Sequence, residues 1–449
     1  MNIITIDIGS SNTKCCVVSC LDQKVLFHSF TETPDRLVND NPLYFEIDTR
    51  NILNVIDNFI NEATAKYSIS GLFFSTQMHG YVYQTEDNPS KYVSWQDSRC
   101  LQQYNGEAIL DTIEKNADEA IVEKLGIPIK SSMGVLNLYA DSLLNPNFNK
   151  NGTLYSLGSF LIHHYTGENV THITNAAPMG ILDITNNTIN HEWIRFLALD
   201  NIDLPVVTDD PYTSCGNFTM NNQTIKVFPD LGDQQVSILG AKARKDEFIF
   251  NIATAAQICC IEDNVVHGNY EIRPYFENSY LYTVTNLPAG RNLKLLVDFV
   301  KESNELFNNT LSDQEIYDKV HSILRFDTTL KINTDFFSKN GGSMFNINYN
   351  NFTIKELFEG TYNDIVDKYN YTTSELLKDF KHNKGLFLGG VAYHNETLVN
   401  LINTRLRLNS TVSKSKFDIF NGLLRIALIA FGLYPNIEST YEISLKEDI

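Results

Sequence analysis

The chain has 449 residues, enough to bury a large core and to form two domains, since single hydrophobic cores stop growing at roughly 250–300 residues. Hydrophobic residues make up 43% of the chain and charged residues 20%, as in ordinary globular proteins. The formal net charge of −19 argues against sequence-independent binding to nucleic acid or to an anionic membrane, which needs clustered lysine and arginine.

The first thirty residues predict three short strands joined by turns. "NIITIDI" alternates as a strand does, "KCCVVSC" follows a turn of small polar residues, and "VLFHSF" follows a second turn. The first turn is rich in small and polar residues, namely Asp7, Gly9, Ser10, Ser11, Asn12, Thr13 and Lys14. Converging backbone N–H groups and hydroxyls can hold a phosphate, and Lys14 adds a positive charge. The alternative is an ordinary hairpin in which Asp7 caps its own turn.

Asp7 is the unusual member of this turn, because a carboxylate repels phosphate. A metal ion between the two removes the conflict, and Mg²⁺ binds one or two carboxylates together with substrate oxygens. Asp7 is therefore a candidate Mg²⁺ ligand.

The next segment, "RNILNVIDNFINEATAKY" (50–67), has the apolar period of a helix, and "SISGLFFSTQMHG" (68–80) resembles a buried strand that ends in a polar loop. Strands that alternate with helices predict an α/β lobe with a mixed sheet. Two polar segments follow, "STQMHGYV" (75–82) and "SWQDSRC" (94–100), and both suit contacts with a small polyol. The alternatives are a structural histidine at 79, a core tryptophan at 95, and a surface ion pair between Asp97 and Arg99.

The boundary between the two domains is predicted near 220–230, which gives domains of 1–228 and 229–449. "PDLGDQQVSILGA" (229–241) then offers the best candidate for a general base, Asp233, at the start of a predicted helix. Such a carboxylate can accept a hydroxyl proton while the oxygen attacks a γ-phosphate. An acid at a helix start is also what capping favours.

The segment "DEFIFNIATAAQICCIEDN" (246–264) repeats the opening pattern of strand, small polar turn and strand. Two equivalent lobes that each offer a hairpin to a shared cleft would explain the repetition. The sequence pattern supports two unrelated hairpins equally well. Amphipathic helices are predicted at 292–307 and 355–369. "FLGGVAYHN" (387–395) is predicted as a strand, a glycine turn and the start of a helix, where two glycines allow close approach to a flat ligand such as adenine. A mostly buried helix is predicted at 418–432.

Several motifs are missing from the sequence. GxxxxGK[ST], GxGxxG, HExxH and GxSxG do not occur, which argues against Walker-type, Rossmann, zincin and α/β-hydrolase chemistry. The seven cysteines form no CxxC pair and no zinc spacing, so we expect buried, reduced thiols. No signal peptide or apolar run long enough for a membrane span is recognised, and a cytoplasmic protein is expected.

Six segments, taken in order, resemble the FGGY family of carbohydrate kinases. They are "DIGSSNTK", "MHG", "WQDSR", "LGDQQ", "NIATAAQ" and "LGGVAYHN". "ITNAAPMGILD", "RPYFENSYLYTVTNLPAGRN" and "IKELFEG" are similar to the sedoheptulokinase-like branch, with the xylulokinase-like branch as its neighbour. The resemblance implies an α/β, two-lobed actin-like ATPase (ribonuclease H-like) fold with an interlobe cleft. It also implies ATP and Mg²⁺ as cofactors.

The resemblance further implies the role of each site residue. Asp233 would be the catalytic base and Asp7 the metal ligand. The sugar contacts would be Met78, His79, Trp95 and Asp97. The nucleotide contacts would be Ser10, Ser11, Asn12, Lys14, Thr254, Gly290, Gly389 and Gly390.

The resemblance is incomplete at the second phosphate turn. Ala253 and Ala255 flank Thr254 where the family usually has glycine and serine, so a donor is lost and backbone angles that glycine allows are restricted. The expected function is ATP-dependent phosphorylation of a sedoheptulose- or xylulose-like ketose. The alternatives are a catalytically weak sugar and nucleotide sensor of the same family, or a non-enzymatic actin-like ATPase module. The expected partners are a small sugar and ATP, with no nucleic acid and no membrane, and a homodimer is the default assembly.

Overall fold

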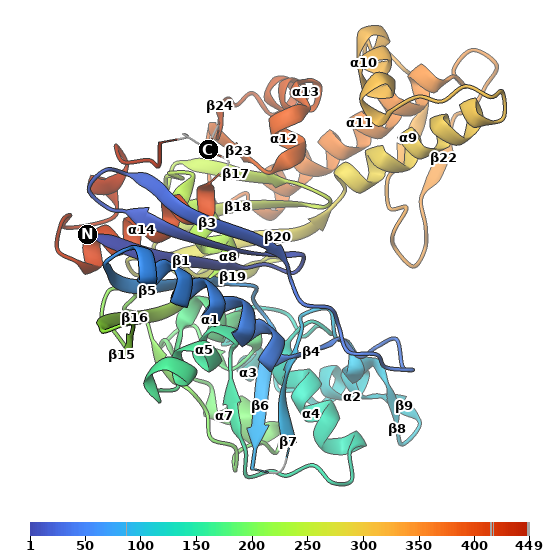
Figure 1. Ribbon diagram of the computed structural model, residues 1–449. Helices are drawn as coiled ribbons and strands as arrows, with labels where there is room; N and C mark the ends of the chain where they lie inside the picture. The colour runs from blue at the N-terminus through green and yellow to red at the C-terminus, as the bar shows by residue number, and fades with distance from the viewer. Residues whose placement is uncertain (87, 414, 416, 447–449) are drawn as a thin grey trace.

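The protein, described by a computed structural model that covers residues 1–86, 88–413, 415 and 417–446, is built around two six-stranded sheets (Figure 1). The strands of the first sheet lie in the order β15 (Gly216–Met220), β16 (Gln223–Gly232), β5 (Ile69–Thr76), β1 (Asn2–Ile8), β2 (Asn12–Ser19) and β3 (Lys24–Glu32). β1 runs antiparallel to β2 and parallel to β5, and β5 runs parallel to β16. The mixed sheet predicted from the sequence is confirmed.

The second sheet repeats this arrangement. Its strands lie in the order β19 (Glu271–Pro274), β20 (Tyr280–Leu287), β18 (Ala256–Glu262), β17 (Glu247–Ile252), β23 (Lys384–Leu388) and β24 (Asn409–Val412). The antiparallel pair β17 and β18 corresponds to β1 and β2, and the parallel neighbour β23 corresponds to β5. The two hairpins therefore hold equivalent places, which confirms the two-lobe explanation of their similar sequences.

The remainder of the first lobe covers its sheet with helices and adds a smaller sheet. The smaller sheet has the order β10 (Thr153–Tyr155), β6 (Tyr81–Thr85), β7 (Asn88–Val93) and β4 (Glu46–Asp48). The main helices are α1 (Thr49–Lys66), α2 (Ile109–Asn116), α3 (Glu119–Glu123), α4 (Gly134–Leu144), α5 (Leu157–Thr166), α6 (Ile173–Met179) and α7 (His191–Phe196). Short two-stranded ladders pair β8 (Gln103–Tyr104) with β9 (Glu107–Ala108), β11 (Val170–His172) with β14 (Val206–Thr208), and β12 (Leu182–Asp183) with β13 (Thr188–Ile189).

The second lobe carries the remaining helices. They are α9 (Gly290–Glu305), α10 (Asp313–Ile323), α11 (Ile354–Tyr371), α12 (Gly390–His394) and α13 (Glu396–Leu406). With the short ladder of β21 (Lys331–Asn333) and β22 (Ser343–Phe345), helices α9 to α11 project to one side of the molecule (Figure 1). Among the described residues, no helix combines the length and the apolar character that crossing a membrane requires.

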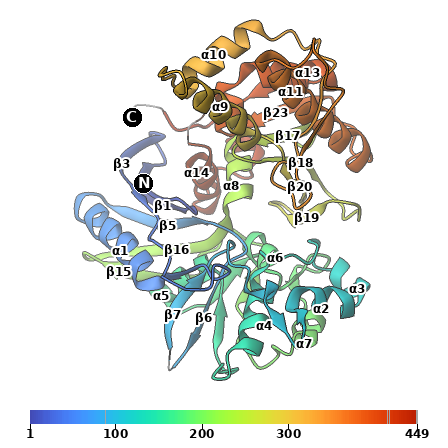
Figure 2. The same cartoon turned by 90° about the vertical axis from the view of Figure 1, so that its right-hand side faces the viewer.

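Two helices, α8 (Asp233–Gly240) and α14 (Asp418–Ala430), lie between the two sheets (Figure 2). A single apolar core joins them to residues of both sheets, including Phe73 of β5 and Ile249 of β17. The helices cross with their backbones in close contact, because a Cβ added to Gly240 would lie 1.6 Å from the carbonyl oxygen of Asp418. A Cβ added to Gly422 would lie 2.2 Å from the carbonyl oxygen of Val236.

Two further predictions can be placed in this fold. The proposed division between 228 and 229 falls inside β16, which continues in the first sheet to Gly232. All seven cysteines are free, and six of them are buried, with Cys215 partly exposed.

Candidate functional site

The two predicted carboxylates are brought together by the register of three parallel strands. Asp7 of β1 is paired with Ser75 of β5, and Ser75 is paired with Leu231 of β16. Neighbouring strands lie about 4.8 Å apart, so Asp7 and Leu231 stand about two strand spacings from each other. Asp233 follows two residues after Leu231 as the first residue of α8. Both acids therefore lie at the carboxyl ends of parallel strands, where α/β proteins commonly bind ligands.

The end of β16 is fixed by a buried network around Asp230. Its carboxylate accepts hydrogen bonds from the Ser156 hydroxyl at 2.7 Å, the His172 backbone N–H at 2.9 Å and the Asn175 side-chain amide at 2.8 Å. Because Asp230 has no exposed surface, these bonds compensate its burial. The network holds the strand end from which α8 and Asp233 start.

Burial raises the pKa values of both acids, and the charge of Asp7 adds to the effect at Asp233. The pKa of Asp233 rises to about 7, mainly through burial and then through the negative charge of Asp7, against the hydrogen bond from the Gln234 backbone N–H. Burial also raises the pKa of Asp7 to about 6, although Lys14 and Ser75 act in the opposite direction. The site therefore contains two carboxylates that titrate near neutral pH. A nearby cation would stabilise the charged form of both.

The first hairpin turn is shorter than the sequence predicts. β2 begins at Asn12, so only residues 9–11 form the turn, and Lys14 lies opposite Asp7 in the ladder. The Lys14 ammonium is 3.6 Å from an Asp7 oxygen. The side chains of Ser10, Ser11 and Asn12 are exposed at the tip. Lys14 therefore compensates part of the charge of Asp7, while the tip remains open to a ligand.

The second hairpin turn is held by the start of α9. The backbone N–H groups of Gly290 and Arg291 donate to the carbonyl oxygens of Ala253 and Thr254, at 3.1 and 2.9 Å. Thr254 is exposed. Neither Ala253 nor Ala255 has a positive φ. The two alanines therefore cause no backbone strain in this turn, because it uses no conformation that requires glycine.

The two glycines of the predicted adenosine turn have different environments. Gly389 has a φ of 88°, and a Cβ there would lie 2.5 Å from the carbonyl oxygen of Ile252. Gly390, the first residue of α12, has open space around it, since an added Cβ would meet nothing within 4 Å. Gly290 lies beside this turn, because a Cβ there would lie 2.8 Å from Val391. The structure thus gathers the predicted nucleotide residues of the second lobe.

Met78 and His79 lie next to the start of α8. A Cβ added to Gly232 would lie 2.8 Å from the Met78 sulfur, so this methionine packs directly before Asp233. His79 has a φ of 72°, and its Nδ1 atom is buried without a hydrogen-bond partner among the described residues. Burial and the nearby cations Lys130 and Arg273 hold the pKa of His79 well below its usual value. The imidazole of His79 is therefore neutral, and one of its buried nitrogens has no partner among the described residues.

Trp95 and Asp97 have different environments, although they are two residues apart. Trp95 is 41% exposed, so it is not a core residue. Asp97 is fully buried, and its oxygens accept from the Phe45 backbone N–H at 2.7 Å and from the Arg99 guanidinium at 2.8 and 2.9 Å. The ion pair considered from the sequence is present, but it is buried and not on the surface.

A chain of polar residues that the sequence analysis missed lines the same region. Arg273 donates to Gln234, and the Gln234 amide donates to Gln257 at 2.9 Å. Glu271 contacts Lys130 at 2.6 Å and also pairs with Arg273. Gln234 follows Asp233 directly, whereas the others come from β18, β19 and the segment before α4. Only their proximity in space identifies them.

The comparisons with known proteins identify the family and the fold. The family model of the FGGY carbohydrate kinases, N-terminal domain, matches residues 2–240. A search of curated proteins gives no match. Among solved structures, a gluconate kinase from Lactobacillus acidophilus is similar with a TM-score of 0.84 at 18% identity, over 99% of this chain and 92% of that one.

Two further structures show the same fold. A ligand-bound xylulose kinase from Lactobacillus acidophilus has a TM-score of 0.83 at 18% identity, over 99% of this chain and 93% of that one. A Plasmodium falciparum glycerol kinase with ADP has a TM-score of 0.83 at 15% identity, over 100% and 93%. These likenesses confirm the two-lobed actin-like fold. The family model matches more than half of this chain. The chain therefore belongs to the FGGY family of carbohydrate kinases, enzymes that phosphorylate sugars with ATP.

Proposed function

We propose that this enzyme transfers the γ-phosphate of ATP to a hydroxyl of a sedoheptulose- or xylulose-like ketose, with Asp233 as the general base. The observation that carries the proposal is the position of Asp233. It starts α8 at the carboxyl ends of β1, β5 and β16, and the negative charge of Asp7 raises its pKa. The choice of a ketose is supported by the sedoheptulokinase-like segments of the sequence and by the xylulose kinase among the similar structures.

In this proposal Asp233 accepts the proton of the attacking hydroxyl. A pKa of about 7 is close to physiological pH, which combines a large deprotonated fraction with good basicity. The Gln234 backbone N–H, 2.8 Å from one carboxylate oxygen, orients the carboxylate. The other oxygen is assigned to the substrate hydroxyl.

Asp7 is proposed as the Mg²⁺ ligand, directly or through water. The donor set fits the ion, because Mg²⁺ prefers one or two carboxylates and completes its shell with water and phosphate oxygens. The raised pKa of Asp7 shows that this carboxylate lacks full compensation from Lys14 and Ser75 alone. When bound, the ion would neutralise charge on the transferred phosphate.

The nucleotide is proposed to lie between the two hairpin turns. Ser10, Ser11, Asn12 and Lys14 would face its phosphates from the first lobe, and Thr254 would face them from the second. Gly290, Gly389 and Gly390 would border the nucleoside, since Gly390 has open space above it. Both turns are held by backbone hydrogen bonds, so their donors are positioned before the ligand arrives.

The sugar is proposed to contact Met78, His79 and Trp95 beside Asp233. Met78 packs against Gly232, and the free Nδ1 of His79 can bond a substrate hydroxyl. The carboxylate of Asp97 is fully buried, which favours an indirect role in sugar binding. In this role it holds Arg99 and the loop that carries Trp95.

Because the base must be deprotonated, kcat/KM is expected to rise with pH through about 7 and then to level off. The physical cause is the raised pKa of Asp233, which leaves the protonated and inactive form dominant in more acidic solution. The measurement is the pH profile of kcat/KM at saturating Mg²⁺ and ATP. A profile that is flat from about pH 5 to 8 would contradict the assigned base.

The proposed activity is tested by measuring ADP release with a panel of ketoses and polyols. We expect ketose-dependent release at an ordinary enzymatic rate. Binding of sugar and nucleotide without turnover would favour the weak sensor, which the loss of a donor at Ala255 suggests. Nucleotide binding that no sugar affects would favour an actin-like ATPase module.

The cellular setting is part of the same proposal. Seven unpaired thiols suit a reducing cytoplasm. The net charge of −19 argues against partners such as nucleic acid and anionic membranes, and a homodimer is the default assembly.

A further inference from the structure

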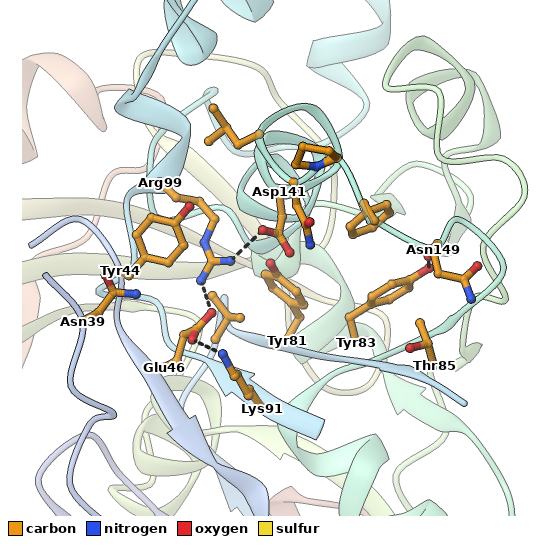
Figure 3. Close-up of a pocket in the computed structure, with 15 residues that line it drawn as sticks. Asn39, Tyr44, Glu46, Tyr81, Tyr83, Thr85, Lys91, Arg99, Asp141 and Asn149 are labelled. Atoms are coloured by element: carbon orange, nitrogen blue, oxygen red, sulfur yellow. Dashed lines mark hydrogen bonds and ion pairs between the residues drawn. The ribbon is translucent and has the colours of Figure 1, made fainter. Parts of the chain in front are cut away.

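A second pocket, of about 620 Å³, lies in the first lobe and contains none of the predicted catalytic or nucleotide residues (Figure 3). One wall is the small sheet, where Tyr81, Tyr83 and Thr85 of β6 face the cavity. The intervening Val82 belongs to the apolar core on the other side of this sheet, as does Tyr92 of β7. Successive side chains of a strand point to opposite faces of the sheet. The pocket therefore lies on one face of the small sheet, and Tyr92, which is near Asp233, lies on the other face.

The charges of the pocket are arranged around Arg99. Its guanidinium contacts Glu46 and Asp97 at 2.8 Å and Asp141 at 3.4 Å, and Lys91 contacts Glu46 at 2.8 Å. Three carboxylates therefore face two cations, and both cations already have acidic partners. Such a pocket disfavours a phosphate or another anionic ligand, since no cation of the cluster is left uncompensated.

The same cluster leaves polar groups without partners. The Tyr81 side chain is 1% exposed, and its hydroxyl has no hydrogen-bond partner among the described residues. In Figure 3 it points into the cavity beside Asp141. Among the described residues the Asp141 carboxylate is paired with Arg99 alone, at the long distance of 3.4 Å, so it can accept further bonds. A buried hydroxyl without a partner is unfavourable, and a ligand hydroxyl would satisfy both groups.

The remaining walls are aromatic and amide surfaces. The Arg99 guanidinium lies over the Tyr44 ring at 4.3 Å, and the rings of Tyr83 and Phe148 are stacked at 5.1 Å with an interplanar angle of 7°. Asn39 and Asn149 line the cavity at opposite sides (Figure 3). Apolar ring faces, hydroxyl and amide donors, and carboxylate acceptors together suit a ligand whose groups both donate and accept.

We propose that this pocket is a second binding site, separate from the catalytic cleft, for a neutral carbohydrate or polyol. Hydroxyls of the ligand bond the Asp141 carboxylate and the Tyr81 hydroxyl, while its C–H faces contact the aromatic walls. The site does not depend on which sugar the enzyme phosphorylates, or on whether it phosphorylates one.

The test uses the full chain labelled with 3-fluorotyrosine and ¹⁹F NMR. The Tyr81 resonance is assigned by its loss in Tyr81→Phe, a substitution that removes only an unpartnered hydroxyl. D-Mannitol and maltose are the probes, with putrescine and inorganic phosphate as charged comparisons. We expect at least one neutral probe to shift the Tyr81 resonance in a saturable way, and neither charged probe to do so.

Asp141→Asn provides the second measurement, because it keeps the shape of the side chain and removes its charge. Hydrogen bonds to charged groups contribute about 1.5–3 kcal/mol, so we expect the affinity for the neutral probe to fall by about tenfold or more. Asp111→Asn, an exposed acid on α2, is the matched control and should leave the affinity unchanged. The proposal is overturned if no neutral probe moves the Tyr81 resonance, if only a charged probe does, or if Asp141→Asn binds as the unmodified protein does.

Discussion

Replacing Asp233 with asparagine is expected to lower the rate of phosphoryl transfer by at least about 10²–10⁴, the usual contribution of a general base. Asparagine keeps the size of the side chain and its hydrogen bond from the Gln234 backbone N–H, but it cannot take up the proton of the attacking hydroxyl. Nucleotide affinity should change little, because the proposed nucleotide residues lie on the two hairpin turns and the adenosine turn.

The measurement is ADP release under saturating substrates, combined with calorimetric titration of the nucleotide. Asp263→Asn is the matched control, since Asp263 is exposed and forms a surface pair with Lys245. An unaffected rate in Asp233→Asn would remove Asp233 from the chemistry. A loss of rate together with a loss of nucleotide binding would instead assign it to binding.

Gly240→Ala is expected to destabilise the protein by about 1–3 kcal/mol or more, because it overpacks a close backbone contact. The added Cβ would lie 1.6 Å from the carbonyl oxygen of Asp418, so one of the two helices must shift. Unlike the end of a flexible side chain, this backbone oxygen cannot move alone. The shift would disturb the apolar core that α8 and α14 share with both sheets.

Thermal denaturation at a fixed scan rate measures this effect as a lower unfolding temperature. The same substitution at Gly390, where an added Cβ meets nothing within 4 Å, should leave that temperature nearly unchanged. Equal unfolding temperatures for Gly240→Ala and the unmodified protein would show that the crossing is more deformable than its geometry indicates.

Much of the site can be predicted from the sequence because its signals are local. Strand alternation and a turn of small residues identify both hairpins, and Asp233 stands in a short acidic and amide-rich segment at a helix start. Family resemblance then orders these segments along the chain. The two equivalent sheets confirm the interpretation of the repeated hairpin.

Other features depend on partners that are distant in the chain. The burial of Asp97 follows from Phe45, which is 52 positions away, and the contact between Lys130 and Glu271 spans 141 positions. The alanines at 253 and 255 show a different limit. The residue type indicates which backbone angles have low energy, but it does not indicate which angles a turn adopts. This turn has no positive φ at either position.

The crossing of α8 and α14 also determines how the lobes can move. Where backbones touch without intervening side chains, sliding is hindered, so we expect relative motion of the lobes to be a rotation about this point. Displacement in a rotation grows with distance from the pivot. Helix α10 lies far from α14, so we expect it to sweep a long arc (Figure 1). A spectroscopic label on α10 would therefore report closure of the enzyme with a large amplitude.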